Sequence, residues 1–358
     1  MPGLLTALLL LRILAGAPGS DPFAFFQPSL TITAEDRRQL DRGVPLARVL
    51  PGADHQIAVV AAIRVNIDGA RLVAWMRRVE ELKKSAYVLA IGRFSEPPVI
   101  GDLAGLALDD EDLTALQRCR PGACDVKLSA VEMTQLRQTL AQAGSNWKPA
   151  AQQAFRRLLL KRVTAYLAKG DTAAPPYEDH DDPVFTAAVF ARIFGRSRFL
   201  TERLPGFAAH LRGYPQAAEP GIESFVYWSK ESVAGKAVAS ATHVSILRGS
   251  DASLPDAVVA GKQIYATHYI NGSLGVTALI RGGSDGHSYL VYVNRSEIDM
   301  LGGVFGGLER WFAERRLKGE AAKIIQGLRR RLESGDPPPL ERRVSMSAPP
   351  YGRGGGRR

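Results

Sequence analysis

The pattern of hydrophobic and polar positions predicts alternating strands and helices in the first third of the chain. Residues 55–66 are rich in β-forming side chains and predict a strand. Residues 68–84 carry apolar positions three and four apart, which is typical of a helix with one buried face. Residues 86–95 predict a second strand, and a short helix and a short third strand are expected at 109–118 and 124–128.

The middle of the chain has a helical period instead. Apolar side chains recur on one face of each segment, and charged side chains fall largely on the other. Helices are expected at residues 130–143, 149–168, 183–194 and 199–211. We therefore interpret residues 129–221 as an all-helical insertion in a β-rich chain.

The β pattern returns after residue 220. Five strands in succession are expected at residues 223–230, 237–247, 257–270, 273–281 and 287–294. Asn271 and Gly272 suit the two central positions of a type I′ turn, so a tight hairpin is expected there. Short connections favour an antiparallel meander, and residues 302–333 follow as one long helix.

This order predicts an α+β fold in which a curved antiparallel sheet packs on a long C-terminal helix. Residues 55–128 and 222–333 form that domain, and residues 129–221 interrupt it. The segment 21–54 contains several prolines and is expected to be irregular apart from a short helix. Residues 334–358 are rich in Pro, Gly and Arg and predict a disordered basic tail.

The order of elements resembles the helix-grip fold of the START and Bet v 1-like superfamily, which includes polyketide-cyclase-like and lipid-transport-like proteins. The resemblance rests on element order over residues 55–128 and 222–333, and no family motif maps onto particular residues. The chain departs from the family by its insertion and by showing one clear helix after the first strand, where the family has two. The resemblance implies a cavity between the sheet and the terminal helix.

The N-terminal segment indicates export. Residues 4–17 form a short apolar run that ends in Ala15-Gly16-Ala17, a sequence with the small-residue form of a cleavage site. We interpret residues 1–20 as a signal peptide of a secreted or periplasmic, bacterial-type protein. Arg12 interrupts the apolar run and no basic residue precedes it, so an uncleaved anchor or a misassigned start codon stays an alternative.

The two cysteines, Cys119 and Cys124, flank a predicted turn. Pro121 and Gly122 suit the central positions of a type II turn, which brings the flanking thiols together. A structural disulfide is expected in an oxidising compartment. Free buried thiols, or metal or redox chemistry, are the alternatives.

The charge of the chain is concentrated at its C-terminal end. The formal net charge is +10, and residues 303–358 hold 13 basic and 6 acidic side chains. The folded body is nearly neutral, which argues against a nucleic-acid groove across it. An anionic membrane surface is therefore expected to meet the C-terminal helix and tail.

The predicted meander is unusually aromatic. Tyrosine and tryptophan combine apolar area with one polar contact, which suits a pocket for a mostly hydrophobic molecule, although aromatics in strands also serve as core and cross-strand pairs. The candidate ligand-binding residues are Tyr227, Trp228, Tyr265, Tyr269, Tyr292 and Trp311. We expect an exported protein that binds a hydrophobic small molecule or lipid.

Three ionisable residues offer an alternative function. Glu231, His243 and His268 lie in or near the predicted strands, and a carboxylate with two imidazoles suits acid–base or metal chemistry. If they shared the cavity, the protein would be an enzyme of hydrolase, cyclase or lyase type. The competing interpretation is that both histidines are satisfied structurally. No motif predicts a resident metal or cofactor, and a non-catalytic cell-envelope interaction protein is the third alternative.

Overall fold

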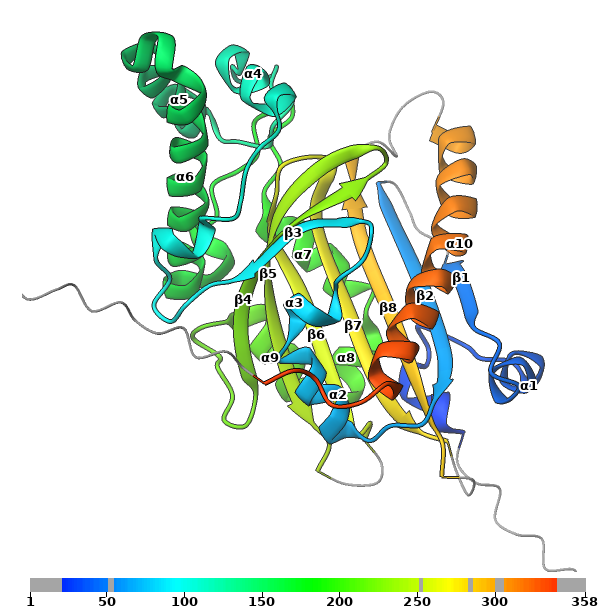
Figure 1. Ribbon diagram of the computed structural model, residues 1–358. Coiled ribbons are helices and arrows are strands. Elements are labelled where there is room, and N and C mark those ends of the chain that lie inside the picture. Colours follow the sequence, from blue (N-terminus) through cyan, green and yellow to red (C-terminus); the bar gives the residue numbers. More distant parts are fainter. Residues whose placement is uncertain (1–20, 51–54, 251–253, 283–285, 300–305, 340–358) are drawn as a thin grey trace, which may run out of the picture.

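The fold is built on one sheet of eight antiparallel strands (Figure 1). The computed structural model describes residues 21–50, 55–250, 254–282, 286–299 and 306–339, without the side chains of 306–316. The strand order is β1-β2-β8-β7-β6-β5-β4-β3. The strands are β1 (Leu46–Leu50), β2 (Gln56–Val65), β3 (Val88–Arg93), β4 (Glu223–Val233), β5 (Lys236–Arg248), β6 (Ala257–Ala266), β7 (Ile270–Arg281) and β8 (Ser288–Ile298).

Helices cover both faces of this sheet. They are η1 (Pro22–Phe26), α1 (Ala34–Asp41), α2 (Gly69–Met76), α3 (Val79–Leu82), η2 (Ile100–Leu103), α4 (Asp110–Arg118), α5 (Ala130–Ala143), η3 (Gly144–Asn146), α6 (Trp147–Lys169), η4 (Gly170–Ala173), α7 (Thr186–Gly195), α8 (Arg198–Arg203), α9 (Pro205–Gly213) and α10 (Gly306–Glu333). In Figure 1, α2, α3 and α10 lie in front of the sheet, and α7, α8 and α9 lie behind it.

The alternation of side chains along each strand gives each face its own core. The core that includes Leu279 and Leu290 also contains side chains of α2, α3 and α10, and we call this side the terminal-helix face. The opposite side, the insertion face, packs against η1 and α7–α9 in one core and against α4–α6 in another. The helical insertion is therefore part of the body's core on the side of the sheet away from α10.

The predicted fold class is confirmed at the level of an α+β chain with an antiparallel sheet. The five-strand meander is present as β4 to β8, and β2 and β3 match the first two predicted strands. The segment 21–54 was expected to lack strands, and this is wrong, because β1 pairs with β2 at the sheet edge. The expected strand at 124–128 is absent, and the bridge nearest to it pairs Arg120 with Ala123 within the cysteine turn.

The predicted turn at Asn271 and Gly272 is also wrong. The chain reverses at residues 267–269, where Tyr269 adopts a φ of 62°. Asn271 and Gly272 lie in β7 instead. The Asn271 amide donates a hydrogen bond to Asp299 Oδ1 at 2.6 Å, and a Cβ on Gly272 would lie 2.8 Å from a side chain of α7. Both residues therefore serve packing rather than chain reversal.

Two predicted helices are divided in the structure. The helix expected over 68–84 is two helices, α2 and α3, because Arg78 leaves the helical region with φ −110° and ψ 47°. The helix expected over 199–211 is divided into α8 and α9 at Pro205, which starts the second helix. The predicted signal peptide and most of the tail lie outside the described residues. Across the part of the chain that is described, no helix combines the length and apolarity needed to cross a membrane.

Candidate functional site

The middle of the terminal-helix face is incompletely covered. α10 packs on β1 and β2, α2 packs on β6, and α3 lies against β3. Between them, side chains of three central strands are partly exposed, although central strands are usually buried on a covered face. We call these residues the central patch: Gly261, Gln263, Ser273, Gly275, Tyr292 and Asn294.

Two glycines make room in the central patch. Gly261 pairs with Gly275, and Gly275 pairs with Asn294, so two adjacent strands lack a side chain at the same level. A Cβ on Gly275 would lie 3.0 Å from the Tyr292 hydroxyl, which shows that the Tyr292 side chain lies over β7. Among the described residues, a Cβ on Gly261 would meet Thr242 at 3.4 Å, an ordinary contact, and no other atom within 4 Å. A side chain can therefore start at Gly261 without a clash with a described residue.

One side of the central patch is a hydrogen-bonded group of amide and hydroxyls. The Asn294 amide nitrogen donates to Ser273 Oγ at 2.9 Å, and Ser296 Oγ lies 2.9 Å from Ser273 Oγ and 2.8 Å from Asn294 Oδ1. Burial raises the pKa of the nearby Tyr292, so its hydroxyl stays protonated at neutral pH. This side offers polar groups without charge.

The other side carries an ion pair. Lys83 Nζ, at the end of α3, lies 2.8 Å from Glu231 Oε1 and 3.3 Å from the Tyr227 hydroxyl. Ser229 donates to the same Glu231 oxygen at 2.6 Å. Burial alone would raise the pKa of Glu231, but the Lys83 ammonium outweighs burial and lowers it. Burial alone would lower the pKa of Lys83, but the nearby Tyr227 and Glu231 outweigh burial and raise it. Both partners are therefore ionised at neutral pH.

Gln263 stands between these two groups. It pairs with Thr242 on β5 and with Ser273 on β7. Its Oε1 atom is buried and has no hydrogen-bond partner among the described residues. A buried carbonyl without a partner is costly, so this atom is an acceptor ready for a donor from outside the chain.

The predicted ligand-binding aromatics divide between the two faces. Tyr227 and Tyr292 lie on the terminal-helix face, beside or within the central patch. Trp228 and Tyr265 belong to the core on the insertion face, where Trp228 Nε1 donates to a backbone carbonyl at 2.8 Å. They do not line the same surface as the tyrosines. Tyr269 lies in the β6–β7 turn, and the Trp311 side chain lies outside the described part of α10.

The structure does not bring Glu231, His243 and His268 together. Glu231 lies on the terminal-helix face with Lys83. His243 lies on the insertion face, where its Nδ1 is 2.8 Å from the hydroxyl of Tyr166 on α6. His268 is not on a strand but in the β6–β7 turn. The expectation that these three could share one active site is therefore wrong, because strand alternation and a shifted turn separate them.

His243 is a buried, neutral side chain. It is 1% exposed, and its Nε2 has no hydrogen-bond partner within the described part of the chain. Burial, with smaller effects from Lys262 and His210, lowers its pKa from 6.5 to about 3. The Tyr214 ring packs on it with centroids 4.3 Å apart. His243 therefore belongs to the contact between sheet and insertion.

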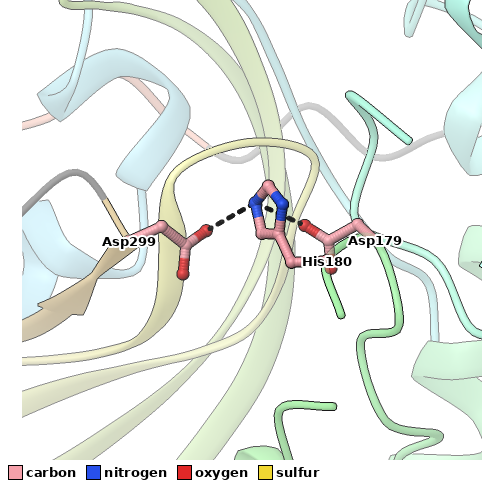
Figure 2. Close-up of side chains that lie close together, drawn as sticks. All are labelled: Asp179, His180 and Asp299. Atoms are coloured by element: carbon pink, nitrogen blue, oxygen red, sulfur yellow. Dashed lines mark ion pairs between the residues drawn. The ribbon is translucent and has the colours of Figure 1, made fainter. Parts of the chain in front are cut away.

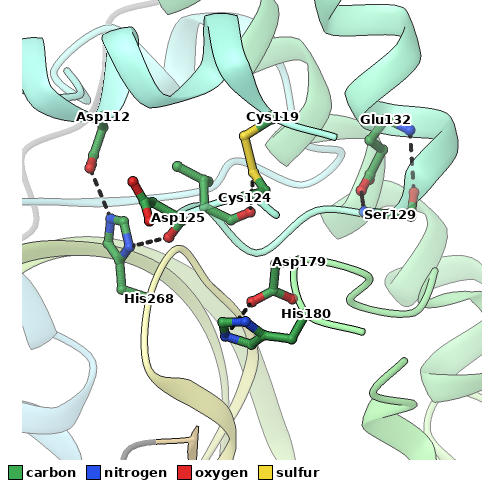
Figure 3. Close-up of a disulfide and its surroundings, with 10 residues drawn as sticks. Asp112, Cys119, Cys124, Asp125, Ser129, Glu132, Asp179, His180 and His268 are labelled. Carbon is green, nitrogen blue, oxygen red and sulfur yellow. Dashed lines mark hydrogen bonds and ion pairs between the residues drawn. A yellow bond between two sulfur atoms is a disulfide. The ribbon is translucent and has the colours of Figure 1, made fainter. Parts of the chain in front are cut away.

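The disulfide lies beside the second histidine (Figure 3). Cys119 and Cys124 are bonded, with an S–S distance of 1.95 Å, and Gly122 has the positive φ of 77° expected of the predicted turn. The bond joins the end of α4 to the segment carrying Asp125, whose carbonyl oxygen lies 2.7 Å from His268 Nδ1. Asp112 of α4 lies 3.0 Å from His268 Nε2. Both ring nitrogens are thus satisfied structurally.

One group of described side chains has metal-ligand composition (Figure 2). The ligand atoms of Asp179, His180 and Asp299 lie within 4.8 Å of one another. However, the buried Lys127 ammonium already contacts both carboxylates, at 3.3 Å from Asp179 Oδ2 and also at Asp299. A divalent cation would have to displace that ammonium. We therefore interpret the group as an ion-pair network.

Two surface hollows lie away from the central patch. One, of about 660 Å³, lies beside the disulfide and is rimmed by acidic residues that include Asp110 and Glu111. The other, of about 750 Å³, lies at the start of α2, where Arg281 pairs with Asp256. Their charged side chains are largely exposed or paired, so they give no reason to place a ligand in either hollow.

The expected contact with an anionic membrane stays a prediction. Residues 340–358 lie outside the described residues. In the described part of α10, Lys318, Lys323 and Arg330 are exposed, as is Ile324. These cations are on the surface of the helix, which is compatible with that prediction.

Sequence reasoning missed Lys83, Gln263 and Asn294. Lys83 follows the helical period and has the pattern of a solvated charge, and its role depends on α3 ending opposite β4. Gln263 had a usable signal, because it lies two residues after Gly261 on the face of β6 that begins with the apolar Ala257 and Val259.

Comparison with known proteins adds little to this geometry. No family model matches the chain, and no curated protein matches it. Among solved structures, the chain is similar to the protein TTHA0849 from Thermus thermophilus, with 13% identity, a TM-score of 0.24, and coverage of 38% of this chain and 86% of that chain. A similarity at this level carries no argument about fold or function.

Proposed function

We propose that the protein binds a small organic molecule on the terminal-helix face, over the central patch. The observation that carries the proposal is the row of partly exposed polar side chains in the middle of a sheet that helices cover at both sides. Ligand sites commonly place a few polar groups on a surface that is otherwise covered, which supports this placement.

The order of elements supports the proposal. Strand β2 is followed by two helices, α2 and α3, then by β3, the β4–β8 meander and α10. This order resembles that of the helix-grip superfamily, in which the face toward the terminal helix encloses the ligand. The two helices after β2 remove one departure from the family pattern, and the insertion remains the other.

The central patch changes the kind of ligand that we propose. A purely apolar chain would leave Gln263 Oε1 buried without a partner and would remove the partly exposed Lys83–Glu231 pair from water, which is unfavourable. The partly exposed Tyr292 ring still offers apolar area beside these polar groups. The proposed ligand is therefore amphipathic, rather than the wholly hydrophobic molecule expected from the sequence.

Filling the site tests the proposal. The Gly261→Leu variant places a side chain above the patch, where a Cβ meets nothing closer than 3.4 Å. Gly195→Leu is the matched control, because Gly195 is exposed at the end of α7 and a Cβ there meets nothing within 4 Å. The full chain and both variants are purified from the native host and analysed by native mass spectrometry, before and after denaturation.

We expect the unmodified chain and Gly195→Leu to release a small molecule on denaturation, and Gly261→Leu to release none. An unmodified chain that carries no bound molecule would overturn the proposal. So would equal release from Gly261→Leu, because that molecule would then be bound elsewhere.

We also propose that the protein is exported. The Cys119–Cys124 bond is the observation that supports this, since structural disulfides persist in oxidising compartments.

A further inference from the structure

The hydrogen-bond acceptors in and beside the central patch limit the chemical class of ligand that can bind there. Gln263 Oε1 is buried without a partner in the described structure and can only accept a hydrogen bond. Two polar contacts reach Glu231, from Lys83 and Ser229, and both use Oε1. Among the described residues, the second carboxylate oxygen, Oε2, is left without a partner on a side chain that is 29% exposed. The site therefore presents one buried acceptor without a partner, Gln263 Oε1, and one partly exposed carboxylate oxygen, Glu231 Oε2.

The charges in this region cancel. Lys83 and Glu231 neutralise each other at 2.8 Å. Arg93, on the neighbouring strand β3, places its guanidinium over the Phe225 ring at 3.9 Å and so is engaged away from the patch. A ligand carboxylate would have to lie beside Glu231, and a ligand ammonium beside Lys83. In each arrangement this repulsion offsets the attraction to the other member of the pair, so the ligand charge gains little in return for its desolvation.

We infer that the ligand is an uncharged, hydroxyl-bearing ring compound that donates hydrogen bonds to Gln263 and Glu231. This inference rests on the proposed function and adds the ligand class to it. A hydroxyl donates without carrying charge, and a ring can pack against the partly exposed Tyr292 ring. Gln263 is the residue that determines specificity, because its Oε1 atom is buried. A ligand without a donor would leave that atom unpaired, since water does not reach it freely.

Three probes that share one ring system test the inference. 2-Naphthol carries a hydroxyl donor, 2-methoxynaphthalene lacks the donor, and 2-naphthoate carries a negative charge at pH 7. Binding of each to the full chain is measured by fluorescence titration at pH 7. We expect 2-naphthol to bind about fivefold to tenfold more tightly than 2-methoxynaphthalene, as one added hydrogen bond implies, and 2-naphthoate to bind least.

The variant Gln263→Met tests whether Gln263 causes the preference for 2-naphthol. Gln263→Met keeps the size of the side chain and removes its acceptor. We expect it to bind 2-naphthol no better than 2-methoxynaphthalene, with its affinity for 2-methoxynaphthalene unchanged. Gln135→Met, at an exposed position on α5, is the matched control and keeps the preference for 2-naphthol. Circular dichroism melting of both variants confirms that they fold.

The outcomes separate the two proposals. If all three probes bind equally, or if 2-naphthoate binds best, the ligand class is wrong while binding itself stands. If Gln263→Met weakens every probe to the same extent, Gln263 is structural and the inference is wrong. If no probe binds and the purified chain carries no molecule, the proposed function fails and the inference fails with it.

Discussion

Acid should destabilise this protein through His243, and the variant His243→Asn should remove that effect. His243 is 1% exposed, and the folded state holds it neutral, with a pKa lowered from 6.5 to about 3. Lys262 on β6 and His210 on α9 are the cationic or titratable groups that face it and oppose its protonation. Asparagine does not titrate, and its oxygen can accept the hydrogen bond that Tyr166 makes to Nδ1.

The size of the effect follows from the two pKa values. Because the folded-state pKa is the lower one, the stabilising contribution of neutral His243 is complete above pH 6.5 and is lost as the pH falls below 6.5. With a pKa of about 3 in the folded state, the loss at pH 5 relative to pH 8 is about 2 kcal/mol. Burial also lowers the pKa of His210, so some acid sensitivity persists in the variant.

Urea unfolding at pH 8 and pH 5 measures this difference. We expect the free energy of unfolding of the unmodified chain to fall by about 2 kcal/mol more than that of His243→Asn over this range. His55→Asn is the control, because His55 is exposed, and it should behave like the unmodified chain. Equal losses in the unmodified chain and His243→Asn would refute the argument, since His243 would then be protonated or hydrated in the folded state.

Two further predictions concern the ties that hold the helices in place. Replacing both Cys119 and Cys124 by alanine should lower the free energy of unfolding by about 2 kcal/mol on the chain-entropy model. Urea unfolding without reductant measures this loss, and an unchanged midpoint would contradict a structural bond. Arg331 of α10 donates to three backbone carbonyls at the end of α3, so Arg331→Gln should lower the free energy of unfolding by about 1–3 kcal/mol. Arg330 is exposed, so Arg330→Gln should lower it by almost nothing. Equal losses in the two variants would show that the Arg331 contacts are not stabilising.

The strands could be predicted because their hydrophobic pattern is continuous. The five strands of the meander and the two before the insertion were found within a few residues of their bounds. The edge strand β1 was missed because it is only five residues long and follows Pro45. The turn at Asn271 and Gly272 was misplaced, because the local turn preference is outweighed by the contacts those residues make with Asp299 and α7.

The candidate site was predicted only in part. Tyr227 and Tyr292 were selected for their residue type, and they do lie on the terminal-helix face. Trp228 was selected for the same reason, but it is adjacent to Tyr227 in β4 and so points to the opposite face. Residue type does not show which face of the sheet a side chain points to, and the face decides which aromatic side chains lie together.

The insertion explains why the sequence does not show which face of the sheet each strand side chain points to. A sheet with one covered face alternates apolar and polar residues, and that alternation reveals which side is buried. Here α6 and α9 cover the second face of β5, and every residue from 238 to 246 is buried. On that face His243 contacts the insertion through Tyr166, although its Nε2 has no partner among the described residues, and on the other face the same is true of Gln263 Oε1. Burial on both faces therefore removes the alternation, and the partial exposure of the central patch distinguishes the face that we propose for the ligand from the face that packs on the insertion.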